Sequence, residues 1–539
     1  MDKKFDVIII GAGPNGLEAG VYLSKAGLKV LVLDKRYEIG GGLATDELLL
    51  ADYLFNTHSI YMMMADYAPI YKDIDFEAYN CRHIHPDVQF ALPLSDGRCI
   101  CLYSDMEKTC ESIARISPKD AESYRKLSRI AGMCVDGFIA PATYVPAVPP
   151  LDQVRQLQAT DLGKMVLEYS EKSPQEIVHE FFEHESVRAL MLYVSCMWGL
   201  HYDLGGLGYL VLLYLNRASN YRIARGGSHT IASALAKMIH ENGGIALGPR
   251  RVNEIIIKEG AAQGVVLQDG TTLEAKAVIS TIDPHQTFLK LVGEDNLEED
   301  LTEKVKGWQW EDSSLLTMHL CLEERPNFTA AGSDPQVNDA LIYILGCETE
   351  EDVIKDWDAV HRGEIPEQAS FHCSFPSVHD PLQAPPNRCS GLITRAVPYR
   401  LKEGKEKWYN IDFQDKIGNQ CLDTLKRYAP NMNGDTILQT KVFTPLGIED
   451  KFPSMVEGSY KHGAYLPLQM GYQRPNDECS QHRTPIKNLY VGGSSSYPGG
   501  CVIWGAGYLA ANAVVEDLKG NKWWSEPDTV AKAKKEGLL

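Results

Sequence analysis

Two short apolar runs near the start of the chain flank a glycine-rich turn and a helical pattern. The runs cover residues 5–10 and 29–33, and turn-forming or polar residues bound each of them. Apolar runs of this length are typical of buried strands, whereas the segment between them has the period of a helix. The pattern therefore predicts a strand, a helix and a second strand, arranged as a βαβ unit.

Periodicity elsewhere predicts further helices and strands. Residues 105–131 and 152–198 have a helical pattern, and helices are also expected at 231–242, at 413–428 and from about Gly505. Strands are expected, with Asp96-Gly97 and Asp269-Gly270 as hairpin turns, at 88–92, 99–102, 252–257, 264–268, 273–281, 315–322, 341–345, 369–374, 392–397, 436–443 and 489–491.

One apolar segment, residues 138–151 (FIAPATYVPAVPPL), carries prolines that oppose a helix. It is predicted to be a surface loop packed on its own prolines. A hydrophobic lid, or a patch that dips into a membrane over a substrate tunnel, is the alternative.

Length and charge narrow the class of protein. The chain has 539 residues and a formal net charge of −19. Single cores stop growing at about 250–300 residues, so two or more domains are expected. The negative charge argues against a nucleic-acid partner and against electrostatic adhesion to anionic lipid. No run approaches the ~18 apolar residues of a membrane span, and the first apolar run is too short for a signal peptide.

The cysteines indicate a reducing compartment. There are thirteen, an odd number, and none forms a CxxC pair. We therefore expect free thiols and a cytoplasmic location. Cys99 and Cys101 are expected on opposite faces of a strand. No metal site is predicted: His179 and His184 are five apart, whereas a zinc helix places its histidines at i and i+4.

The glycine-rich turn has the chemistry of a dinucleotide site. In the GAGPNG segment, Gly11 permits a tight turn, Gly13 lets the backbone approach a pyrophosphate, and Gly16 lets the helix pack on the strand. Free N–H groups at the helix start attract the phosphate charge. Asp34 ends the second strand, close to the ~20-residue spacing of the carboxylate that binds ribose hydroxyls.

Two other glycine-rich segments are predicted to contribute to the same groove. Residues 40–42 form a glycine triplet, and residues 488–511 read NLYVGGSSSYPGGCVIWGAGYLAA. Loops of such small residues approach a ligand through their backbone. The helix expected from about Gly505 presents its positive end, which suits negative charge on a bound cofactor.

Taken together, these motifs resemble the phytoene desaturase-like FAD oxidoreductases, within the glutathione-reductase-type and amine-oxidase-type flavoproteins. The resemblance covers both termini, the helix and strands of residues 231–281, and the segment GSYKHG at 458–463 with Gln469 and Arg474-Pro475. It implies an α/β fold with a Rossmann FAD-binding domain and an interleaved mixed α+β substrate domain. The FAD-binding domain would comprise 1–75, 220–290 and 480–539, and the substrate domain 76–219 and 291–479.

The resemblance also implies a role for individual residues. The residues expected to bind FAD are Gly11, Gly13 and Gly16 at the pyrophosphate, Asp34 at the ribose, Gly41, Gly42, Leu43 and Ala44 at the flavin, Val252 at the adenine, and Gly493, Gly500 and Val502 at the ribityl chain and ring. Lys35 is also expected to bind the cofactor. The chain departs from the family pattern at two points. Asp34 replaces the usual glutamate, and Gly493-Ser494 stands where many relatives have Gly-Asp.

FAD is favoured over a pyridine nucleotide because the chain has no second GxGxxG motif and no redox CxxC. His462 and Tyr497 are the candidate catalytic residues, with histidine able to act as an acid or base. The expected activity is desaturation or saturation of a C–C bond in a small hydrophobic substrate, by hydride transfer to or from flavin N5. A flavin amine oxidase, a reduced-flavin isomerase or hydratase, and a flavin-binding scaffold remain alternatives. A homodimer and peripheral membrane contact stay open.

Overall fold

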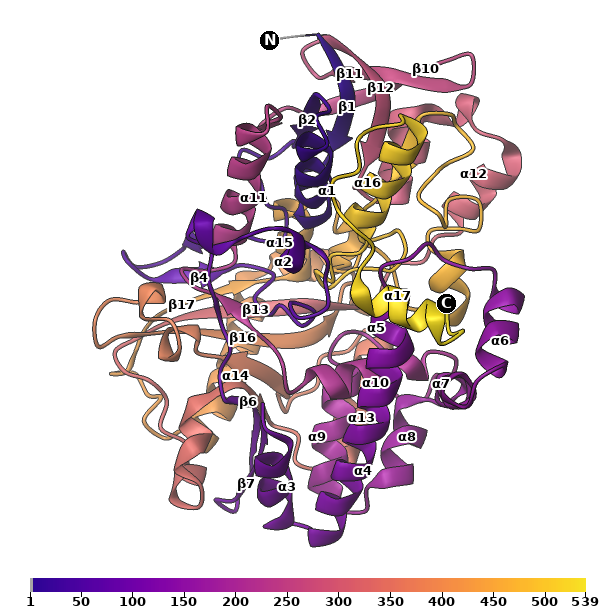
Figure 1. The fold of residues 1–539 in the computed structure, drawn as a ribbon. Helices are drawn as coiled ribbons and strands as arrows, with labels where there is room; N and C mark the ends of the chain where they lie inside the picture. Colours follow the sequence, from indigo (N-terminus) through magenta and orange to yellow (C-terminus); the bar gives the residue numbers. More distant parts are fainter. Residues whose placement is uncertain (1–2) are drawn as a thin grey trace.

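The computed structural model describes residues 3–539. It contains two seven-stranded sheets, which lie in the upper and lower parts of the molecule in Figure 1. The first sheet has the order β10-β11-β12-β1-β2-β9, with β18 also paired to β12. Its strands are β1 (Lys4–Ile10), β2 (Val30–Leu33), β9 (Ile245–Leu247), β10 (Val252–Lys258), β11 (Ala261–Leu267), β12 (Thr272–Ser280) and β18 (Leu489–Val491).

Alternation along β1 explains the two covered faces of this sheet. Val7 and Ile9 belong to the core that also contains α1 (Pro14–Lys25), α11 (His229–Glu241) and α16 (Ala506–Asp517). Ile8 and Ile10 belong to a second core with the strands β10 and β11 and the helix α12 (Glu299–Lys306). Because successive side chains point to opposite faces, a continuously apolar strand is buried on both sides.

The second sheet has the order β17-β13-β16-β15-β14-β6-β7. Only β14 and β6 pair in parallel, and the other neighbours are antiparallel. The helix α14 (Ile411–Tyr428) lies over it. Its strands are β6 (Val88–Pro93), β7 (Cys99–Tyr103), β13 (Ser313–Leu322), β14 (Ala340–Leu345), β15 (Phe371–Ser374), β16 (Cys389–Pro398) and β17 (Ile437–Phe443).

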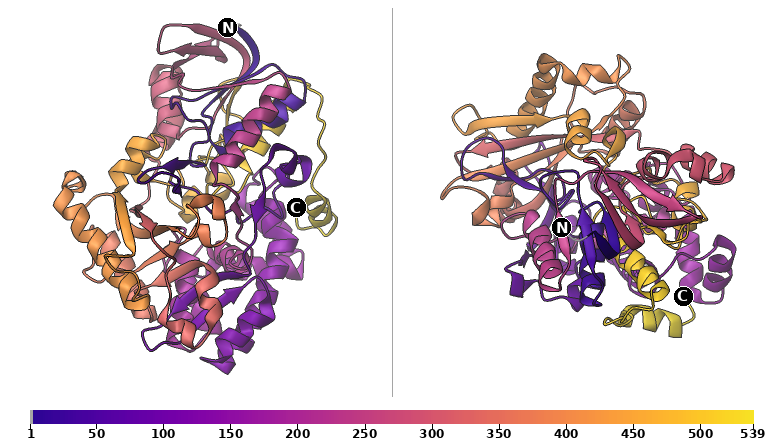
Figure 2. Two further views of the ribbon diagram at one scale, coloured as in Figure 1. Left: turned by 90° about the vertical axis from the view of Figure 1, so that its left-hand side faces the viewer. Right: turned by 90° about the horizontal axis from the view of Figure 1, so that it is seen from above.

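A layer of helices covers the other side of this sheet, as the purple segments in Figure 2 show. These helices are α3 (Met106–Ala114), α4 (Pro118–Cys134), α5 (Ala140–Ala142), α6 (Pro150–Gln158), α7 (Asp161–Glu171), α8 (Pro174–Phe181), α9 (Glu185–Cys196) and α10 (Gly208–Arg217), joined by α13 (Glu350–His361). Among the described residues, no helix has both the length and the apolar character to cross a bilayer.

The prediction of a non-helical surface loop at 138–151 was wrong in part. A π-helical turn at Val135–Ile139 continues into α5, and Pro150 begins α6. Pro150 is the first residue of α6, where the missing N–H of a proline has no partner to lose. Most side chains from Phe138 to Ala147 are buried, and Tyr144 donates a hydrogen bond to the carbonyl of Ile503 (3.0 Å).

The expected placement of Cys99 and Cys101 on opposite faces was also wrong. Both are buried in one cluster, and their sulfur atoms lie within 4.8 Å of each other and of an Asp334 oxygen. Residues two apart on a strand share a face, because the side-chain period is two. Asp334 is bonded to Arg115 (2.7 Å), which gives that carboxylate a protein partner.

Candidate active site

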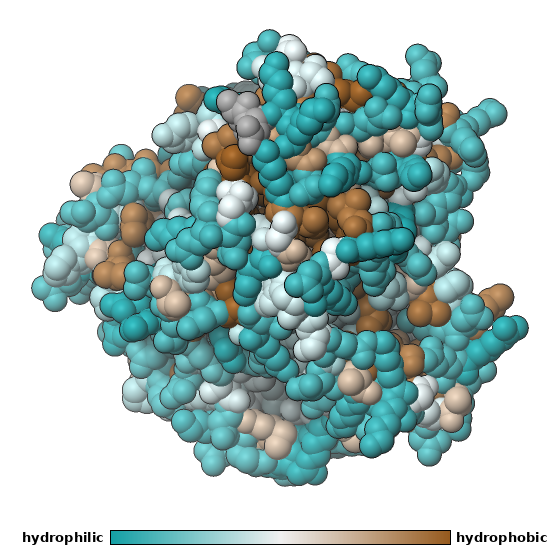
Figure 3. Space-filling model, turned by 45° about the horizontal axis from the view of Figure 1, so that its top comes forward, coloured by the Kyte–Doolittle hydropathy of each residue, from teal (hydrophilic) through white to brown (hydrophobic). Residues whose placement is uncertain are grey.

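A cavity lies between the first sheet and the second. Its wall is built from the turn after β1, the ends of β2 and β12, the start of β10, one face of β13, β15 and β16, and the loops before α16. Figure 3 shows a hollow on the upper face, with hydrophobic residues inside and a hydrophilic rim. Segments far apart in the chain thus form one continuous wall.

At one end of the cavity the GAGPNG turn has the geometry that requires glycine. Gly11 has φ +97°, and a Cβ on Gly16 would lie 1.9 Å from the carbonyl oxygen of Gly11. A Cβ on Gly13 would meet only the Cα of Gly41, at 3.9 Å. Gly13 is also the N-cap of α1 and supplies no side-chain cap. Because Pro14 has no N–H, the helix start presents the N–H groups of Asn15 and Gly16, and neither has a side-chain partner.

Asp34 fixes the end of β2 to this turn. One of its oxygens accepts a hydrogen bond from Ala12 N (2.9 Å) and the other from Arg36 N (2.8 Å). Each carboxylate oxygen keeps a second lone pair for a ligand hydroxyl. Five cationic side chains line the same end of the cavity, in contrast to the negative charge of the whole protein: Lys35, Arg36, Arg250, Arg251 and Lys290. This end is suited to an anion.

The glycine triplet passes directly over the turn. Gly41 has φ +54°, and a Cβ there would lie 2.8 Å from the Cα of Gly13. A Cβ on Gly42 would lie 2.9 Å from the ring of His58 and 2.9 Å from Ser59 Oγ. The two glycine segments are therefore in backbone contact, and bulkier residues would separate them.

The C-terminal loops close the opposite wall. Ser494, Cys501 and Val502 line the cavity, and α16 begins just after them at Ala506. Cys501 and Val502 have φ +64° and +52°. A left-handed conformation is strained for a β-branched residue, and such strain is found where the surrounding structure enforces it at functional sites.

The end of the cavity beyond the glycine segments is apolar and aromatic. It includes Tyr61, Met63, Met197 and Trp198, with the Tyr61 ring stacked on Tyr221 (5.8 Å between centroids). Of the described residues in the wall, Asp34 at the opposite end is the only carboxylate. A neutral ligand is therefore better matched to the aromatic end than a cationic one.

Two histidines flank the middle of the cavity. His462 is in the wall with φ +57°, and its Nδ1 is buried without a partner. Burial, reinforced by the Arg474 charge, lowers the pKa of His462 to about 4. Burial and the nearby His462 lower the pKa of His58 to about 3. Both imidazoles are neutral at pH 7, and either can accept or donate one hydrogen bond.

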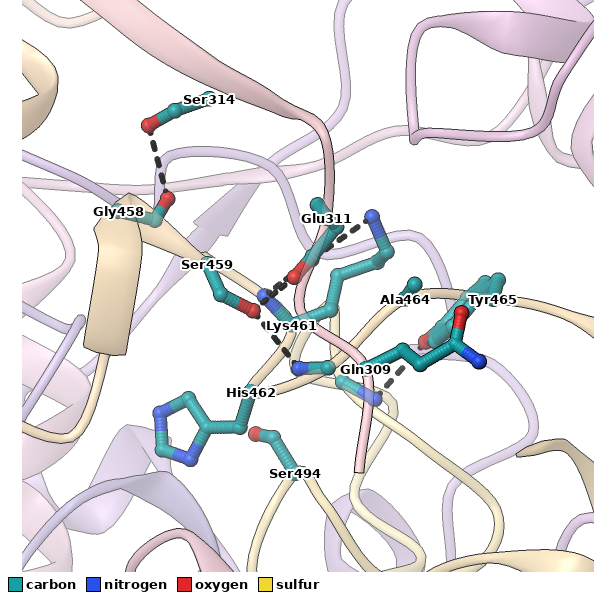
Figure 4. Close-up of polar contacts among 12 residues, drawn as sticks. Gln309, Glu311, Ser314, Gly458, Ser459, Lys461, His462, Ala464, Tyr465 and Ser494 are labelled. Carbon is teal, nitrogen blue, oxygen red and sulfur yellow. Dashed lines mark hydrogen bonds and ion pairs between the residues drawn. The ribbon is translucent and has the colours of Figure 1, made fainter. Parts of the chain in front are cut away.

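Behind His462 lies a charged cluster that sequence patterns did not reveal (Figure 4). Glu311 accepts hydrogen bonds from Ser459 Oγ and from Lys461 N (3.2 Å), and its carboxylate is 3.0 Å from Lys461 Nζ. The ring of His462 points away from this cluster. Glu311 and Lys461 are 150 residues apart, and no motif connects them.

The sequence-predicted site residues divide into two groups. In the cavity wall are Gly11, Gly13, Asp34, Lys35, Gly41, Gly42, Val252, Val502 and His462. Outside it are Gly16, Leu43, Ala44, Gly493, Gly500 and Tyr497. The Tyr497 hydroxyl donates to the carbonyl of Ala142 (2.6 Å), so this side chain holds α5 rather than facing the cavity. His58, Tyr61 and Trp198 line the wall but carry no sequence signal that distinguishes them from core residues.

Several known proteins are similar to this chain. A family model described as the Thi4 family matches residues 3–60. One of the subunits of limonene dehydrogenase from Castellaniella defragrans is 40% identical over 551 aligned positions, covering 100% of this chain and 99% of that one. A neurosporene-forming phytoene desaturase from Rhodobacter capsulatus is 24% identical, covering 95% and 94%. The crystal structure of an oxidoreductase from Methanosarcina mazei has a TM-score of 0.60 at 18% identity, covering 95% and 100%.

Proposed function

The chain belongs to the phytoene desaturase-like family of flavin-dependent oxidoreductases, and on that premise we propose that it uses FAD to dehydrogenate a neutral hydrophobic molecule. The family and the α/β, glutathione-reductase-type fold agree with the sequence prediction. The protein is a flavin-dependent dehydrogenase or desaturase. The identity of the flavin, the residues that hold it and the substrate are the proposal.

The residues at the cationic end fit FAD. Gly13 leaves open space where a side chain would project, and the start of α1 offers N–H groups to a pyrophosphate. Asp34 would bind the ribose, and Val252 would contact the adenine. Gly41, Gly42 and Val502 would border the ring system, which supplies hydride transfer when bound.

The single observation that carries the substrate proposal is the aromatic end of the cavity, where the described wall has no carboxylate. A protonated amine would lose its hydration there without gaining a counter-charge, which disfavours the amine oxidase alternative. Limonene and phytoene, the substrates in the names of the two relatives, are hydrocarbons. A substrate of that chemical class would fit Tyr61, Met63, Met197 and Trp198.

His462 is proposed to handle the proton that accompanies hydride transfer. Its Nδ1 is unpartnered at the wall, and its neutral ring can accept a proton from the substrate carbon next to the one that loses hydride. Tyr61 and Trp198 would orient the substrate and exclude water. Tyr497 has no direct role in this proposal, because its hydroxyl is bonded to Ala142.

Anaerobic titration of the purified protein tests the proposal. The flavin released by heat is first identified by mass. The oxidised flavin is then titrated with a cyclic monoterpene, a primary amine of similar size, and NADPH. We expect FAD, and bleaching of its visible absorbance by the hydrocarbon alone. FMN in place of FAD, or bleaching by the amine, would refute the cofactor or the substrate class.

Location and assembly are further proposals. All thirteen cysteines are unpaired and twelve are buried, which supports a reducing compartment such as the cytoplasm. The limonene dehydrogenase relative is named as one subunit of an enzyme, so we propose that this chain also acts in an oligomer, either a homodimer or a complex with a different chain. Light scattering of the protein alone and after copurification separates these two cases.

A further inference from the structure

Three charged side chains are buried together behind the C-terminal wall of the cavity. The side chains of Lys461 and Glu311 have exposed fractions of 0% and 3%, and Arg474 is 0% exposed. Burying charges costs several kcal/mol per ion, and apolar residues of similar volume commonly serve packing as well or better. The cluster therefore calls for an explanation beyond stability.

The cluster carries more positive than negative charge. Lys461 pairs with Glu311. Burial alone would lower the pKa of Lys461, but Glu311, with smaller contributions from Tyr460 and Cys501, raises it overall. Arg474 donates instead to uncharged oxygens, including the carbonyls of Ser494 (2.9 Å) and Lys461 (3.0 Å). It also packs between the rings of Trp308 and Tyr465.

The other titratable groups around the cluster are neutral at pH 7. Burial raises the pKa of the Cys501 thiol to about 11 and that of Tyr460 to about 12, and it also raises the pKa of Tyr465. His462 is neutral because its pKa is about 4. Two cations and one carboxylate leave a net charge of +1.

This charge lies one residue layer from the cavity. A Cβ on Gly500 would be 3.0 Å from the Cα of Lys461, so the lysine backbone packs directly against the loop that supplies Cys501 and Val502. The Arg474 guanidinium holds Ser494, another residue of the wall. Buried charges are weakly screened, so their field reaches a cofactor in the cavity.

We propose that Lys461, Glu311 and Arg474 form a fixed positive charge that stabilises the anionic reduced state of the bound flavin and so sets its reduction potential. The inference rests on the proposed flavin site, and it assigns these side chains an electrostatic role without direct contact with the substrate. A negatively charged reduced flavin gains from the nearby cation, whereas the neutral oxidised flavin does not.

Charge-changing variants of the flavin-loaded protein separate this role from packing. Lys461→Met leaves Glu311 and Arg474, with a net charge of zero. The double variant Lys461→Met with Glu311→Gln restores the net charge of +1 while removing the same lysine. The midpoint potential is measured by spectroelectrochemical titration at pH 9, so that the carboxyl left without its partner stays ionised.

We expect the Lys461→Met variant to lose at least tenfold in the equilibrium constant for flavin reduction, which is about 30 mV for a two-electron couple. The double variant should stay within threefold of the wild type, as should Lys461→Arg, which keeps the charge. An unchanged potential in Lys461→Met, or an equal fall in the double variant, would overturn the proposal. Thermal unfolding and flavin occupancy are recorded for each variant.

If Lys461→Met does not fold, Glu311→Gln at pH 6 provides the test, because both cations then remain without the carboxylate. The potential should rise above that of the wild type, and an unchanged or lower potential would overturn the proposal. None of these measurements needs a substrate. A wild-type protein that binds no flavin would refute the proposed function. Flavin-loaded variants whose midpoint potential does not change with the charge would refute only this inference.

Discussion

At the level of single residues, the role of a side chain in the site depends on its conformation and protonation state as well as on its residue type. Gly13 is valuable for the space that it leaves, and His462 for a ring whose Nδ1 has no protein partner. Cys501 and Val502 hold left-handed backbones that glycine would adopt without strain. Sequence patterns indicate where such residues stand, but the conformations of His462 and Val502 follow only from the packing around them.

Gly13→Val should abolish flavin binding while leaving the fold intact. The new side chain would project into the open space beside the start of α1, where the pyrophosphate is proposed to lie. The visible absorbance of purified protein, relative to its absorbance at 280 nm, measures flavin content. Gly332→Val is the matched control, because a Cβ at that position meets no atom within 4 Å and lies outside the cavity. A yellow Gly13→Val protein with full occupancy would refute the assignment.

We expect that titration of His462 does not change the rate of flavin reduction between about pH 5.5 and pH 8.5. Its pKa is lowered to about 4 by burial and then by Arg474, so the ring is neutral throughout that range and gains a proton only below it. Stopped-flow reduction by the hydrocarbon donor measures the profile. An inflection near pH 6.5 that disappears in His462→Gln, but not in the exposed control His240→Gln, would contradict this assignment.

At the level of elements, the βαβ unit is the part that sequence specifies best. The apolar runs, the glycine spacing and Asp34 are all local, so the predicted β1, α1 and β2 agree with the structure. The contact between α1 and α16 is not local. A Cβ on Gly507 would lie 2.2 Å from the carbonyl oxygen of Asn15, which shows how closely the two helix starts approach. Nothing in either sequence segment specifies that approach.

Glu18 in α1 provides a test of this helix contact. The side chain is fully buried, one oxygen accepts from Tyr508 N (3.1 Å), and the other has no partner. Burial raises the pKa of Glu18 well above 4.5, with Asp73 adding to the shift and the Tyr508 hydrogen bond opposing it. The folded state thus keeps a proton that the unfolded chain loses above about pH 4.5. Stability is therefore lost as pH rises from that value toward the folded pKa.

Glu18→Gln removes this titration and keeps the shape of the side chain. We expect little change in stability near pH 4.5 and a growing stabilisation at higher pH, by up to about 1.4 kcal/mol per pH unit. Denaturant midpoints at pH 5 and pH 8 measure the difference. The exposed Glu254→Gln is the control and should behave as the wild type at both pH values. A Glu18→Gln protein destabilised equally at both would show that the carboxyl is ionised or otherwise required.

At the level of the whole molecule, the sequence predicts most strands and helices but not how distant segments meet. The hairpin of β6 and β7 enters the second sheet through parallel pairing with β14, and Glu311 meets Lys461 from another part of the chain. Both contacts depend on tertiary packing, which leaves no local pattern. The error at β7 has a different cause. Cys99 and Cys101 are two residues apart on a strand and therefore share a face, so the sequence alone was enough to predict their placement correctly.

The same packing buries several histidines, and we expect this burial to make the protein less stable in acid. His319 in β13 is fully buried between Phe55 (5.2 Å) and Phe443 (5.4 Å), and neither ring nitrogen has a partner. Burial, with a smaller effect of Lys451, lowers the pKa of His319 to about 3. The unfolded chain takes up this proton below about pH 6.5. Stability from the neutral ring is complete above pH 6.5 and is lost as pH falls toward 3.

His319→Phe should reduce this acid sensitivity, because phenylalanine fills a similar space without a titratable ring. We expect stabilisation of about 1 kcal/mol at pH 7, from removing two unpaired polar atoms, and about 2 kcal/mol more at pH 5. The unfolding midpoint recorded from pH 8 to pH 5 measures both effects. If the unfolding midpoints of the variant and the wild type differ by the same amount at every pH, the pKa of His319 is not lowered in the folded state. Any acid sensitivity would then have to come from the other histidines whose pKa burial lowers, such as His58, His372 and His462 in the cavity wall.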